Sequence, residues 1–281
     1  VVPVHNAAET LPTLVGAFFT LNRSGLICQM ICVDDASEDQ RAIVLRGLKA
    51  QHSDLIVVSL PINRGAGVAR NIGWSYARGR YTMFFDADDI LHPEVLLDAI
   101  LEMDKAPETD LTVFSYCFCR GEPSSSINMH HRDRQIFGSL LKGAFSITDV
   151  LDSMPNMLTF TNYPWNKLIR TDHYKRVGMR FGHTKVNNDI LGHWHSLLLA
   201  RNISLRNAVV CTHVVPLMGK NLTNYFGVER LAMFDALCET YSFLVDHPAL
   251  RYRFSHQFWG FCDQMVEWAR PRLEPGLLNE F

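Results

Sequence analysis

The chain has 281 residues, a formal net charge of −2 and a hydrophobic fraction of 47%, the composition of an ordinary globular protein with one large domain or two small ones. The near-neutral charge argues against a dedicated nucleic-acid binder, whose surface would be basic. The sequence contains no run of 18 or more apolar residues, so we expect no transmembrane helix.

Short apolar strands alternate with helical segments through the first 120 residues. The predicted strands are residues 1–4, 30–33, 55–60, 81–85 and 111–120, and the helices after the first four strands are 11–21, one opened by a capping box at 37–40, 68–77 and 94–103. This alternation predicts a parallel sheet with right-handed crossovers. No signal peptide is visible, but the chain opens inside a strand, so we expect residues to precede Val1.

The second half of the sequence changes character. A polar stretch at 121–135, with a proline, three serines and two adjacent histidines, predicts a loop. The elements expected after it are a helix at 136–152, a strand at 165–170, a helix from 189 through 199, a strand at 203–215, a glycine-containing loop at 217–224 and helices from 226 onward.

Three carboxylates, Asp86, Asp88 and Asp89, follow the buried strand at 81–85. Acids this close repel one another unless a cation lies among them. Oxygen ligands on a short turn suit Mg²⁺ or Mn²⁺, which usually also bind substrate phosphates. A helix start capped by Asp89 would explain one of the three acids only. The pattern therefore predicts a divalent-metal site.

Polar residues also follow the other early strands, where an isolated acid would usually be a cap or turn residue. The residues at these four strand ends are His5, Asn6, Asp34, Asp35, Asn63, Arg64, Asp86 and Asp88. Ligands of open α/β sheets bind at the carboxyl ends of the strands. Their convergence at one edge predicts a site of nucleotide size.

Other phosphate-binding chemistries fit the sequence less well. Gly65-Ala-Gly67 resembles half of a dinucleotide fingerprint, but it lacks the third glycine and follows the third strand rather than the first. No P-loop motif occurs. An Asp-x-Asp phosphatase would carry its motif after the first strand, and a nucleotidyltransferase would show a glycine-rich basic turn there.

Five strings carry a specific resemblance: VVPVHNAAETL, ICVDDASED, NRGAGVARNIGWSYARGRYTMFFDADDIL, WNKLIR and NNDILGHW. They resemble the inverting GT-A glycosyltransferases of the family-2 type, bacterial enzymes that build capsules, O-antigens and related glycans. The resemblance implies an α/β GT-A fold with a Rossmann-like, mostly parallel sheet. It also implies a nucleotide-sugar-binding half at 1–120, an acceptor-binding half at 121–225 and a C-terminal helical extension at 226–281.

The resemblance also implies roles for residues of the donor half. It puts Pro3, His5 and Glu9 beside the nucleobase and ribose, Asp35 on the base with Asp34 supporting it, and Asn63, Gly65 and Arg70 near the nucleotide and its phosphates. His5 departs from the aromatic Tyr or Phe more usual in the family. Asp86, Ala87 and Asp88 match the family's D-x-D motif, with Asp86 toward the ribose and the metal and Asp88 on the metal.

On the acceptor side, Asp189 matches the catalytic base, and Asn188 replaces the acidic residue that usually precedes it. His213 is a candidate third metal ligand, although imidazole suits softer metals better than Mg²⁺. Lys220 is a candidate for closing over the diphosphate, with a solvated surface lysine as the alternative. Trp165 would stack against an acceptor sugar or lie in the core. His193 would orient the base or simply pack.

The implied reaction is a single displacement with inversion, of the hexosyltransferase type. A carboxylate accepts the proton of the attacking hydroxyl, and the metal stabilises the leaving diphosphate. The donor is expected to be a UDP-sugar, and the acceptor a glycan or a lipid-linked glycan. The alternative is a catalytically degenerate GT-A module that binds glycans or partner proteins, because Asn188 and His5 depart from the family pattern.

The C-terminal segment and the cysteines bear on location. Phe254, Phe258, Phe261, Met265 and Trp268 lie on one helical stripe flanked by arginines, which predicts a core or partner contact, with a membrane-surface helix as the alternative. The seven cysteines include no C-x-x-C pair, which favours reduced thiols. We expect a cytoplasmic protein that acts in solution or at the inner face of the membrane.

Overall fold

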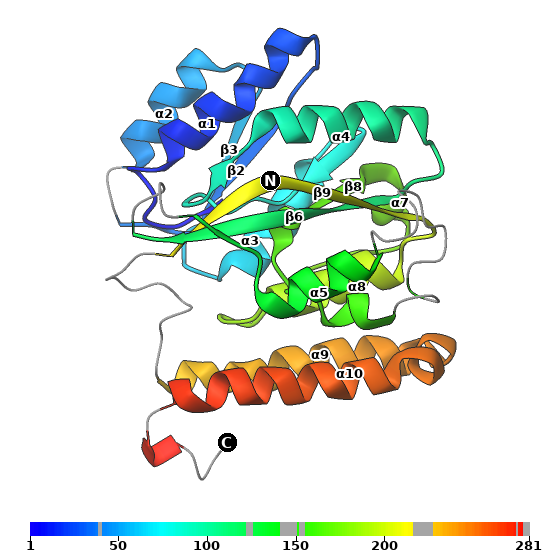
Figure 1. Cartoon of the computed structure of the whole chain (residues 1–281). Coiled ribbons are helices and arrows are strands. Elements are labelled where there is room, and N and C mark those ends of the chain that lie inside the picture. The colour runs from blue at the N-terminus through cyan, green and yellow to red at the C-terminus, as the bar shows by residue number, and fades with distance from the viewer. Residues whose placement is uncertain are drawn as a thin grey trace.

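The computed structural model describes residues 1–38, 41–121, 126–140, 151, 155–215, 227–273 and 275–277. Figure 1 shows β-strands in a central layer, with α1, α2 and α4 on one side and α3, α5 and α8 on the other. The pair α9 and α10 forms a further layer against α5 and α8, at the end of the molecule farthest from α1. Layers of this kind bury the apolar face of each element against its neighbour.

The first sheet confirms the parallel arrangement predicted for the N-terminal strands. It contains β1 (Val2–Val4), β2 (Met30–Asp34) and β3 (Leu55–Ser59) in that order, with both pairings parallel. The connecting helices are α1 (Leu11–Phe19), followed by the 3-10 turn η1 (Thr20–Ser24), α2 (Arg41–Gln51) and α3 (Ala66–Tyr76). Pro12 in the first turn of α1 costs no hydrogen bond, because that amide has no partner within the helix.

The second sheet is mixed, which corrects the expectation of a parallel arrangement for the fourth strand. Its order is β4 (Tyr81–Met83), β8 (Lys167–Arg170), β6 (Leu111–Arg120), β9 (Ile203–Val215) and β5 (Ile90–Leu91), with β7 (Ile127–Asn128) paired to β6. Only β6 and β9 run parallel. The neighbour of β4 is β8, a strand from the second half of the chain that runs antiparallel to it. The alternation of strands and helices along the sequence does not reveal this pairing.

The two sheets meet where β4 passes β1. The amino group of Val1 donates a hydrogen bond to the Met83 carbonyl (2.8 Å), and the Phe85 amide donates to the Val1 carbonyl (2.9 Å). The chain after β4 therefore begins beside β1, and Asp86 and Asp88 follow directly after this contact.

The remaining helices complete the two faces. They are α4 (Pro93–Lys105), α5 (His131–Leu140), η3 (Pro155–Thr159), η4 (Pro164–Asn166), α7 (Thr171–Arg176) and α8 (Asp189–Leu198), followed by η6 (Val228–Leu231), α9 (Ala232–Asp246), α10 (Pro248–Ala269), η7 (Arg270–Arg272) and η8 (Pro275–Leu277). The stretch expected to be a loop at 121–135 contains β7 and the start of α5, and residues 165 and 166 form a 3-10 turn before β8. The loop predicted at 217–224 lies outside the described residues.

The aromatic stripe of α10 is part of the core, as the sequence favoured. Phe254, Phe258, Phe261 and Met265 are buried, and Trp194 of α8 meets the rings of Phe258 and Phe261 at 5.4 and 5.8 Å. The stripe therefore packs the C-terminal pair of helices against the layer that contains α8. Within the described ranges, no helix is long and apolar enough to span a bilayer. All seven cysteines are free, as expected for reduced thiols.

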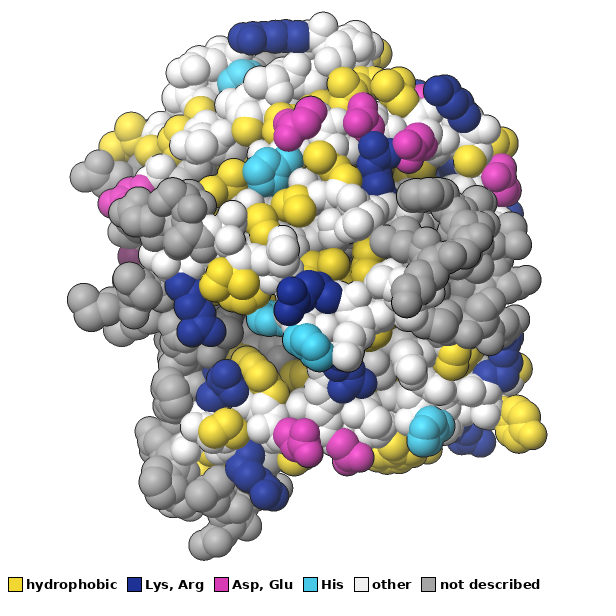
Figure 2. All heavy atoms as spheres, in the orientation of Figure 1, with side chains coloured by type: hydrophobic (Ala, Val, Ile, Leu, Met, Phe, Trp, Pro, Cys, Tyr) yellow, Lys and Arg dark blue, Asp and Glu magenta, His cyan; other side chains and the backbone are white. Residues whose placement is uncertain are grey.

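Acidic side chains gather near the top of the face shown in Figure 2, over α4, and basic side chains lie among them. Most of the other charged side chains in this view are basic, with further acidic ones near the bottom. Part of the acidic group is neutralised, because Arg206 of β9 pairs with Asp98 and Glu102 of α4. These exposed pairs contribute little stability each.

A fully buried aspartate joins the starts of β6 and β9. Asp110 accepts hydrogen bonds from the Arg201 amide (2.9 Å), Nε (2.9 Å) and Nη2 (2.7 Å). Burial alone would raise the pKa of Asp110, but the hydrogen bonds and charge of Arg201 outweigh it, so the pKa is lowered. The ionised carboxylate therefore stabilises the fold above the ordinary aspartate pKa, and this contribution disappears as the pH falls through the lowered value.

We predict that Asp110→Asn lowers the free energy of unfolding at pH 7 by about 1.5–3 kcal/mol, the range for hydrogen bonds to a charged group. The loss should shrink as the pH falls below about 4, where the carboxylate of the unfolded chain becomes protonated, and should vanish below the lowered pKa of the folded state. Urea unfolding at pH 7 and pH 3 measures both effects. Asp98→Asn, whose side chain is 62% exposed, is the matched control and should change stability by less than about 1 kcal/mol. An equal loss in the two variants would contradict the prediction.

Candidate functional site

Asp35 holds the loop that leads into α3. Its carboxylate accepts hydrogen bonds from the amides of Arg64 and Gly65, both at 2.7 Å. Gly65 has a φ of +87°, a conformation that a side chain would strain. Asp35 is itself buried, and its amide donates to the Val4 carbonyl (2.9 Å). Asp35 thus joins the end of β1 through its amide and the loop after β3 through its carboxylate, and its role in binding a nucleobase remains a prediction.

His5 and Asn63 gather above Asp35. The Nδ1 atom of His5 lies 3.0 Å from the Asp35 carbonyl oxygen, and the Asn63 amide donates to the same oxygen (3.3 Å). The side chains of His5 and Asn63 also lie within 3.3 Å of each other. Both are exposed, so they form a polar rim around the loop. The predicted convergence of the first three strand ends is therefore present.

The other donor-side residues lie at the same edge. Pro3 is half-buried in the middle of β1 and lies opposite Val33, whereas Glu9 is exposed in the turn before α1. Asp34 is buried, and its carboxylate accepts hydrogen bonds from the Ser37 amide (3.2 Å) and hydroxyl (3.0 Å). Asp34 therefore shapes the turn after β2, which agrees with a supporting role.

Arg70 links the two halves of the chain. It is buried in α3, where its Nη2 forms an ion pair with Asp86 (2.6 Å) and its Nη1 donates to the Asn188 side-chain oxygen (2.9 Å). The face of the Phe181 ring lies 5.3 Å from its guanidinium. Arg70 was expected near the phosphates of a nucleotide, and in the structure it contacts Asp86 of the D-x-D motif and the residue before Asp189.

The three acids after β4 have different environments. Asp86 is half-buried against Arg70, Ala87 is buried, and Asp88 is exposed to solvent. Although Asp88 is accessible to solvent, the protein atoms around its carboxylate raise its pKa, and the negative charge of Asp86 raises it further. Asp89 is buried and accepts hydrogen bonds from His213 Nδ1 (2.8 Å) and the Val214 amide (2.9 Å). Asp86 and Asp88 are therefore the two carboxylates that remain for a ligand.

His213 does not complete a three-residue metal site. Across the ranges that the structure describes, no group of three His, Cys, Asp or Glu side chains is arranged to hold a metal ion. The predicted trio with Asp86 and Asp88 is not assembled, because His213 Nδ1 is directed at Asp89. Burial lowers the pKa of His213, but the hydrogen bond with Asp89 and the charges of the neighbouring acids raise it overall. The pair joins β9 to the acidic turn.

Asp189 begins α8 directly after Asn188. Burial raises the pKa of Asp189 to about 6, against the opposing charge of Arg70 and a hydrogen bond from Asn162. The positive helix end was expected to keep this carboxylate ionised near neutral pH. Burial has the larger effect, yet a pKa of about 6 still leaves the group mainly ionised at pH 7. Such a carboxylate is suited to accept a proton near neutrality.

Several other predicted residues have structural roles or lie beyond the described chain. Trp165 is fully buried and stacks on Tyr163 at 4.4 Å, so its core interpretation holds and the expected stacking on an acceptor does not fit. Asn188, expected on the acceptor side, is likewise buried and bound to Arg70. His193 is a buried packing histidine near the Leu158 carbonyl (3.1 Å). Lys220 lies outside the described residues.

No pattern in the sequence predicted the contacts that hold residues 180–188, the segment before Asp189. A Cβ on Gly67 would lie 2.1 Å from the Gly182 carbonyl oxygen, so α3 approaches this segment more closely than any side chain allows. Gly67 was noticed only as part of an incomplete fingerprint. The backbone at Asn6, Ala36 and Asn187 has positive φ values of 52°, 51° and 57°, beside three of the expected site residues. Backbone strain of this kind clusters at functional sites.

Comparisons with known proteins match this chain to one family model and to several curated proteins. The model of the glycosyl transferase family 2 matches residues 1–178. A poly(ribitol-phosphate) beta-glucosyltransferase of Bacillus spizizenii is 26% identical over 73% of this chain, and the succinoglycan biosynthesis protein ExoO of Rhizobium meliloti is 33% identical over 38%. The chain spans only 30% and 29% of the lengths of these relatives.

Solved structures share the fold. TarS of S. aureus in complex with UDP-GlcNAc has a TM-score of 0.67 at 21% identity, covering 84% of this chain and 63% of that one. The mannosyltransferase PcManGT of Pyrobaculum calidifontis, in complex with GDP-Man and Mn²⁺, has a TM-score of 0.59 at 17% identity, covering 95% and 73%. The expected GT-A fold is thereby confirmed.

The close approach at Gly67 gives a test of the site's packing. We expect Gly67→Ala to lower the free energy of unfolding by about 1–3 kcal/mol, the usual cost of overpacking, because the backbone of Gly182 must move. Gly47→Ala in α2, where a Cβ would meet nothing within 4 Å, is the control and should be neutral or stabilising by up to about 1 kcal/mol. Equal stability of the two variants in urea unfolding would show that the close approach is absent.

Proposed function

Because the chain belongs to glycosyl transferase family 2, we propose that it transfers a sugar from a nucleotide donor to a hydroxyl group of a glycan or lipid-linked acceptor. One observation carries this proposal. Arg70 bonds to Asp86 of the D-x-D motif and to Asn188, the residue before Asp189. The acids that would hold the metal for the donor diphosphate and the carboxylate that would accept a proton thus lie around one guanidinium.

The donor is a UDP-sugar in this proposal. The loop that Asp35 holds, with the rim of His5 and Asn63, supports a nucleotide bound at the ends of β1 to β3. Pro3, Glu9, Asp34 and Gly65 shape or border the same edge. A relative of this fold binds UDP-GlcNAc, and the Bacillus relative is named for transfer of glucose to poly(ribitol-phosphate). A hexose on UDP is the donor class that these observations favour.

The residues present fit a divalent cation. Arg70 is a cation close to Asp86, Asp88 and Asp189, and the raised pKa of Asp88, caused by burial and by the charge of Asp86, is consistent with a carboxylate that a bound cation would stabilise. Mg²⁺ is commonly held by one or two carboxylates together with substrate phosphates, so Asp86 and Asp88 suffice. A bound Mg²⁺ or Mn²⁺ would act as a Lewis acid that stabilises the charge of the leaving diphosphate.

Asp189 is the general base in this proposal. The acceptor hydroxyl loses its proton to the Asp189 carboxylate as its oxygen attacks the anomeric carbon, and the bond to the diphosphate breaks. Attack from the face opposite the leaving group inverts the configuration in one step. The helix start fixes the carboxylate, and Arg70 limits the rise of its pKa.

The proposal keeps the division by role that the resemblance implies. Residues 1–120 would bind the donor, residues 121–225 would bind the acceptor, and residues 226–281 would be the C-terminal helical extension. The ion pair of Arg70 with Asp86 lies within the first part, and the bond of Arg70 to Asn188 joins the first part to the second.

A catalytically degenerate binding module would keep the fold without turning over a donor. Metal-dependent hydrolysis of a panel of UDP-sugars separates that alternative from an enzyme.

Asp88→Asn tests the metal site. The variant should lose a charged ligand and reduce Mn²⁺-dependent UDP binding by at least about tenfold, within the 10–100-fold range seen for altered metal sites. Circular dichroism should remain unchanged, because Asp88 is exposed. Calorimetry of UDP binding with and without Mn²⁺ measures the effect, and Asp98→Asn on the surface of α4 is the control. Unchanged Mn²⁺-dependent affinity would remove Asp88 from the metal site.

Asp189→Asn tests the base. It preserves size and removes the proton acceptor, so transfer should fall by about 10²-fold or more while UDP affinity stays unchanged. In the wild type, kcat should fall with decreasing pH below about 6, because the carboxylate with a pKa of about 6 is then protonated. Initial-rate measurements from pH 5 to pH 8 give both results. A variant that transfers sugar at the wild-type rate would end the assignment.

A further inference from the structure

The segment from Arg180 to Asn188 precedes the proposed base and is held from two sides. On the side of α3, Asn71 donates to the Phe181 carbonyl (2.9 Å) and accepts from the Phe181 amide (2.8 Å). This reciprocal pair copies the hydrogen bonds that a neighbouring strand would make. Within the segment, the Gly182 amide donates to the Asn188 carbonyl (2.8 Å). Any movement of residue 182 therefore reaches the start of α8.

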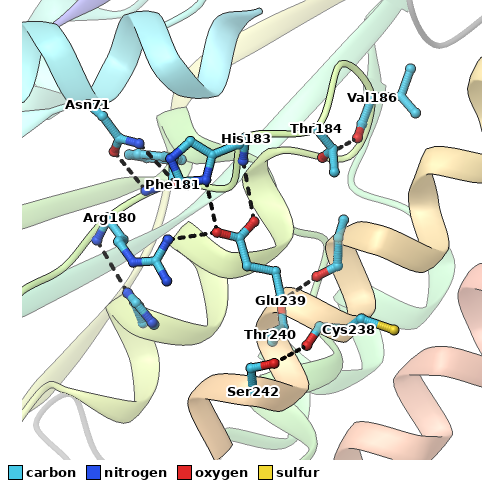
Figure 3. Close-up of polar contacts among 12 residues, drawn as sticks. Asn71, Arg180, Phe181, His183, Thr184, Val186, Cys238, Glu239, Thr240 and Ser242 are labelled. Carbon is cyan, nitrogen blue, oxygen red and sulfur yellow. Dashed lines mark hydrogen bonds and ion pairs between the residues drawn. The ribbon is translucent and has the colours of Figure 1, made fainter.

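On the other side, Glu239 of α9 holds the same segment. Its carboxylate accepts from Arg180 Nη1 (2.6 Å), from the His183 amide (3.3 Å) and from His183 Nδ1 (3.1 Å). Figure 3 shows the carboxylate directed into the loop between Arg180 and His183, with Asn71 and Phe181 behind it. Hydrogen bonds to an ionised acceptor are stronger than those between neutral groups.

The carboxylate occupies a restricted place. The Glu239 side chain is 20% exposed, while those of Arg180 and His183 are 47% and 63% exposed. A Cβ on Gly182 would lie 2.9 Å from a Glu239 oxygen, so the backbone at 182 gives that carboxylate its space. The contact of Glu239 with the segment therefore depends on the backbone at Gly182 as well as on the side chains of Arg180 and His183.

We propose that Glu239 is a positioning residue, through which the C-terminal pair of helices fixes the Arg180–Asn188 segment and thereby Asp189. This inference rests on the proposed function in its reference to Asp189 as the base. Glu239 lies beyond residues 1–178, which the family model matches, so the contact belongs to the part of the chain that the family pattern does not describe. The aromatic stripe of α10 supplies the rigid support, because it is buried against α8 and α9.

The consequence for transfer is a separation of donor binding from turnover. Glu239 makes no direct contact with the loop that Asp35 holds or with the acids after β4 in the described structure. The donor-side residues that border its segment, Gly65 and Arg70, keep their own bonds to Asp35 and Asp86, so donor binding should depend on Glu239 far less than turnover does. A proton acceptor displaced by about 1 Å can cost about 10²-fold in rate. Loss of Glu239 should therefore lower kcat much more than it lowers the affinity for UDP.

Three variants of the full chain test this inference. Glu239→Ala removes the contact, Glu239→Gln keeps the size but not the charge, and Asp235→Ala removes an exposed acid one turn earlier on α9 as the control. Hydrogen exchange followed by mass spectrometry reports on residues 180–188, calorimetry reports the Kd for UDP, and initial rates report kcat.

We expect Glu239→Ala to accelerate exchange at 180–188 and to lower kcat by about 10–100-fold, with a change in the Kd for UDP of less than about twofold. Glu239→Gln should fall between this variant and the wild type, and Asp235→Ala should match the wild type. Unchanged exchange at 180–188, or wild-type kcat in Glu239→Ala, would overturn the inference. A wild-type chain that transfers no sugar from any donor would overturn the proposed function instead, and the exchange data would still decide whether Glu239 holds the segment.

Discussion

The ion pair between Arg70 and Asp86 is the interaction on which the site depends. A guanidinium buried in α3 is costly unless its charge is compensated, and Asp86 compensates it at 2.6 Å. The second arm of the fork binds Asn188, so one side chain connects the third helix, the turn after β4 and the start of α8. Arginine suits this task because its planar fork presents several donors in fixed directions.

This arrangement also explains the replacement of an acid by Asn188. With an acid at that position, Arg70 would face two bonded carboxylates, and Asp189 would have a charged neighbour that raises its pKa further. The neutral amide still accepts the bond from Nη1. The pKa of Asp189 is then set by burial, with Arg70 and Asn162 as the opposing influences. Asn188 is thus compatible with an ionised base at neutral pH.

The acidic turn shows how neighbouring carboxylates take different roles. Asp89 is buried and joined to His213 of β9, so it anchors the turn to the second sheet. Asp86 is joined to α3, and Asp88 projects into solvent between them. The second sheet and α3 therefore both constrain the turn. Asp88, which makes the fewest bonds to other parts of the protein, is the carboxylate proposed to bind the metal. Pre-organisation of this kind lowers the cost of ordering the ligands when the ion binds.

Residues near one another in the sequence were predictable because their patterns are local. The alternation of strands and helices up to 120 indicated the parallel β1–β2–β3 sheet, and Leu111–Arg120 and Ile203–Val215 were recognised as strands at their observed bounds. The polar residues at the strand ends indicated the edge where His5, Asp35 and Asn63 meet, because parallel strands all end on one side of a sheet.

Contacts between distant segments needed the tertiary structure. The antiparallel pairing of β4 with β8, the bond of Arg70 to Asn188 and the hold of Glu239 on Arg180 join residues 59 to 118 positions apart. Such pairings depend on how helices and sheets pack, and no spacing rule along the chain encodes them. Burial is equally a property of the packed fold, and it placed Trp165 in the core and raised the pKa of Asp189. The sequence by itself determined which residue types end the strands, and the tertiary structure decided which of them meet, because only packing brings distant segments within bonding distance and removes water from around them.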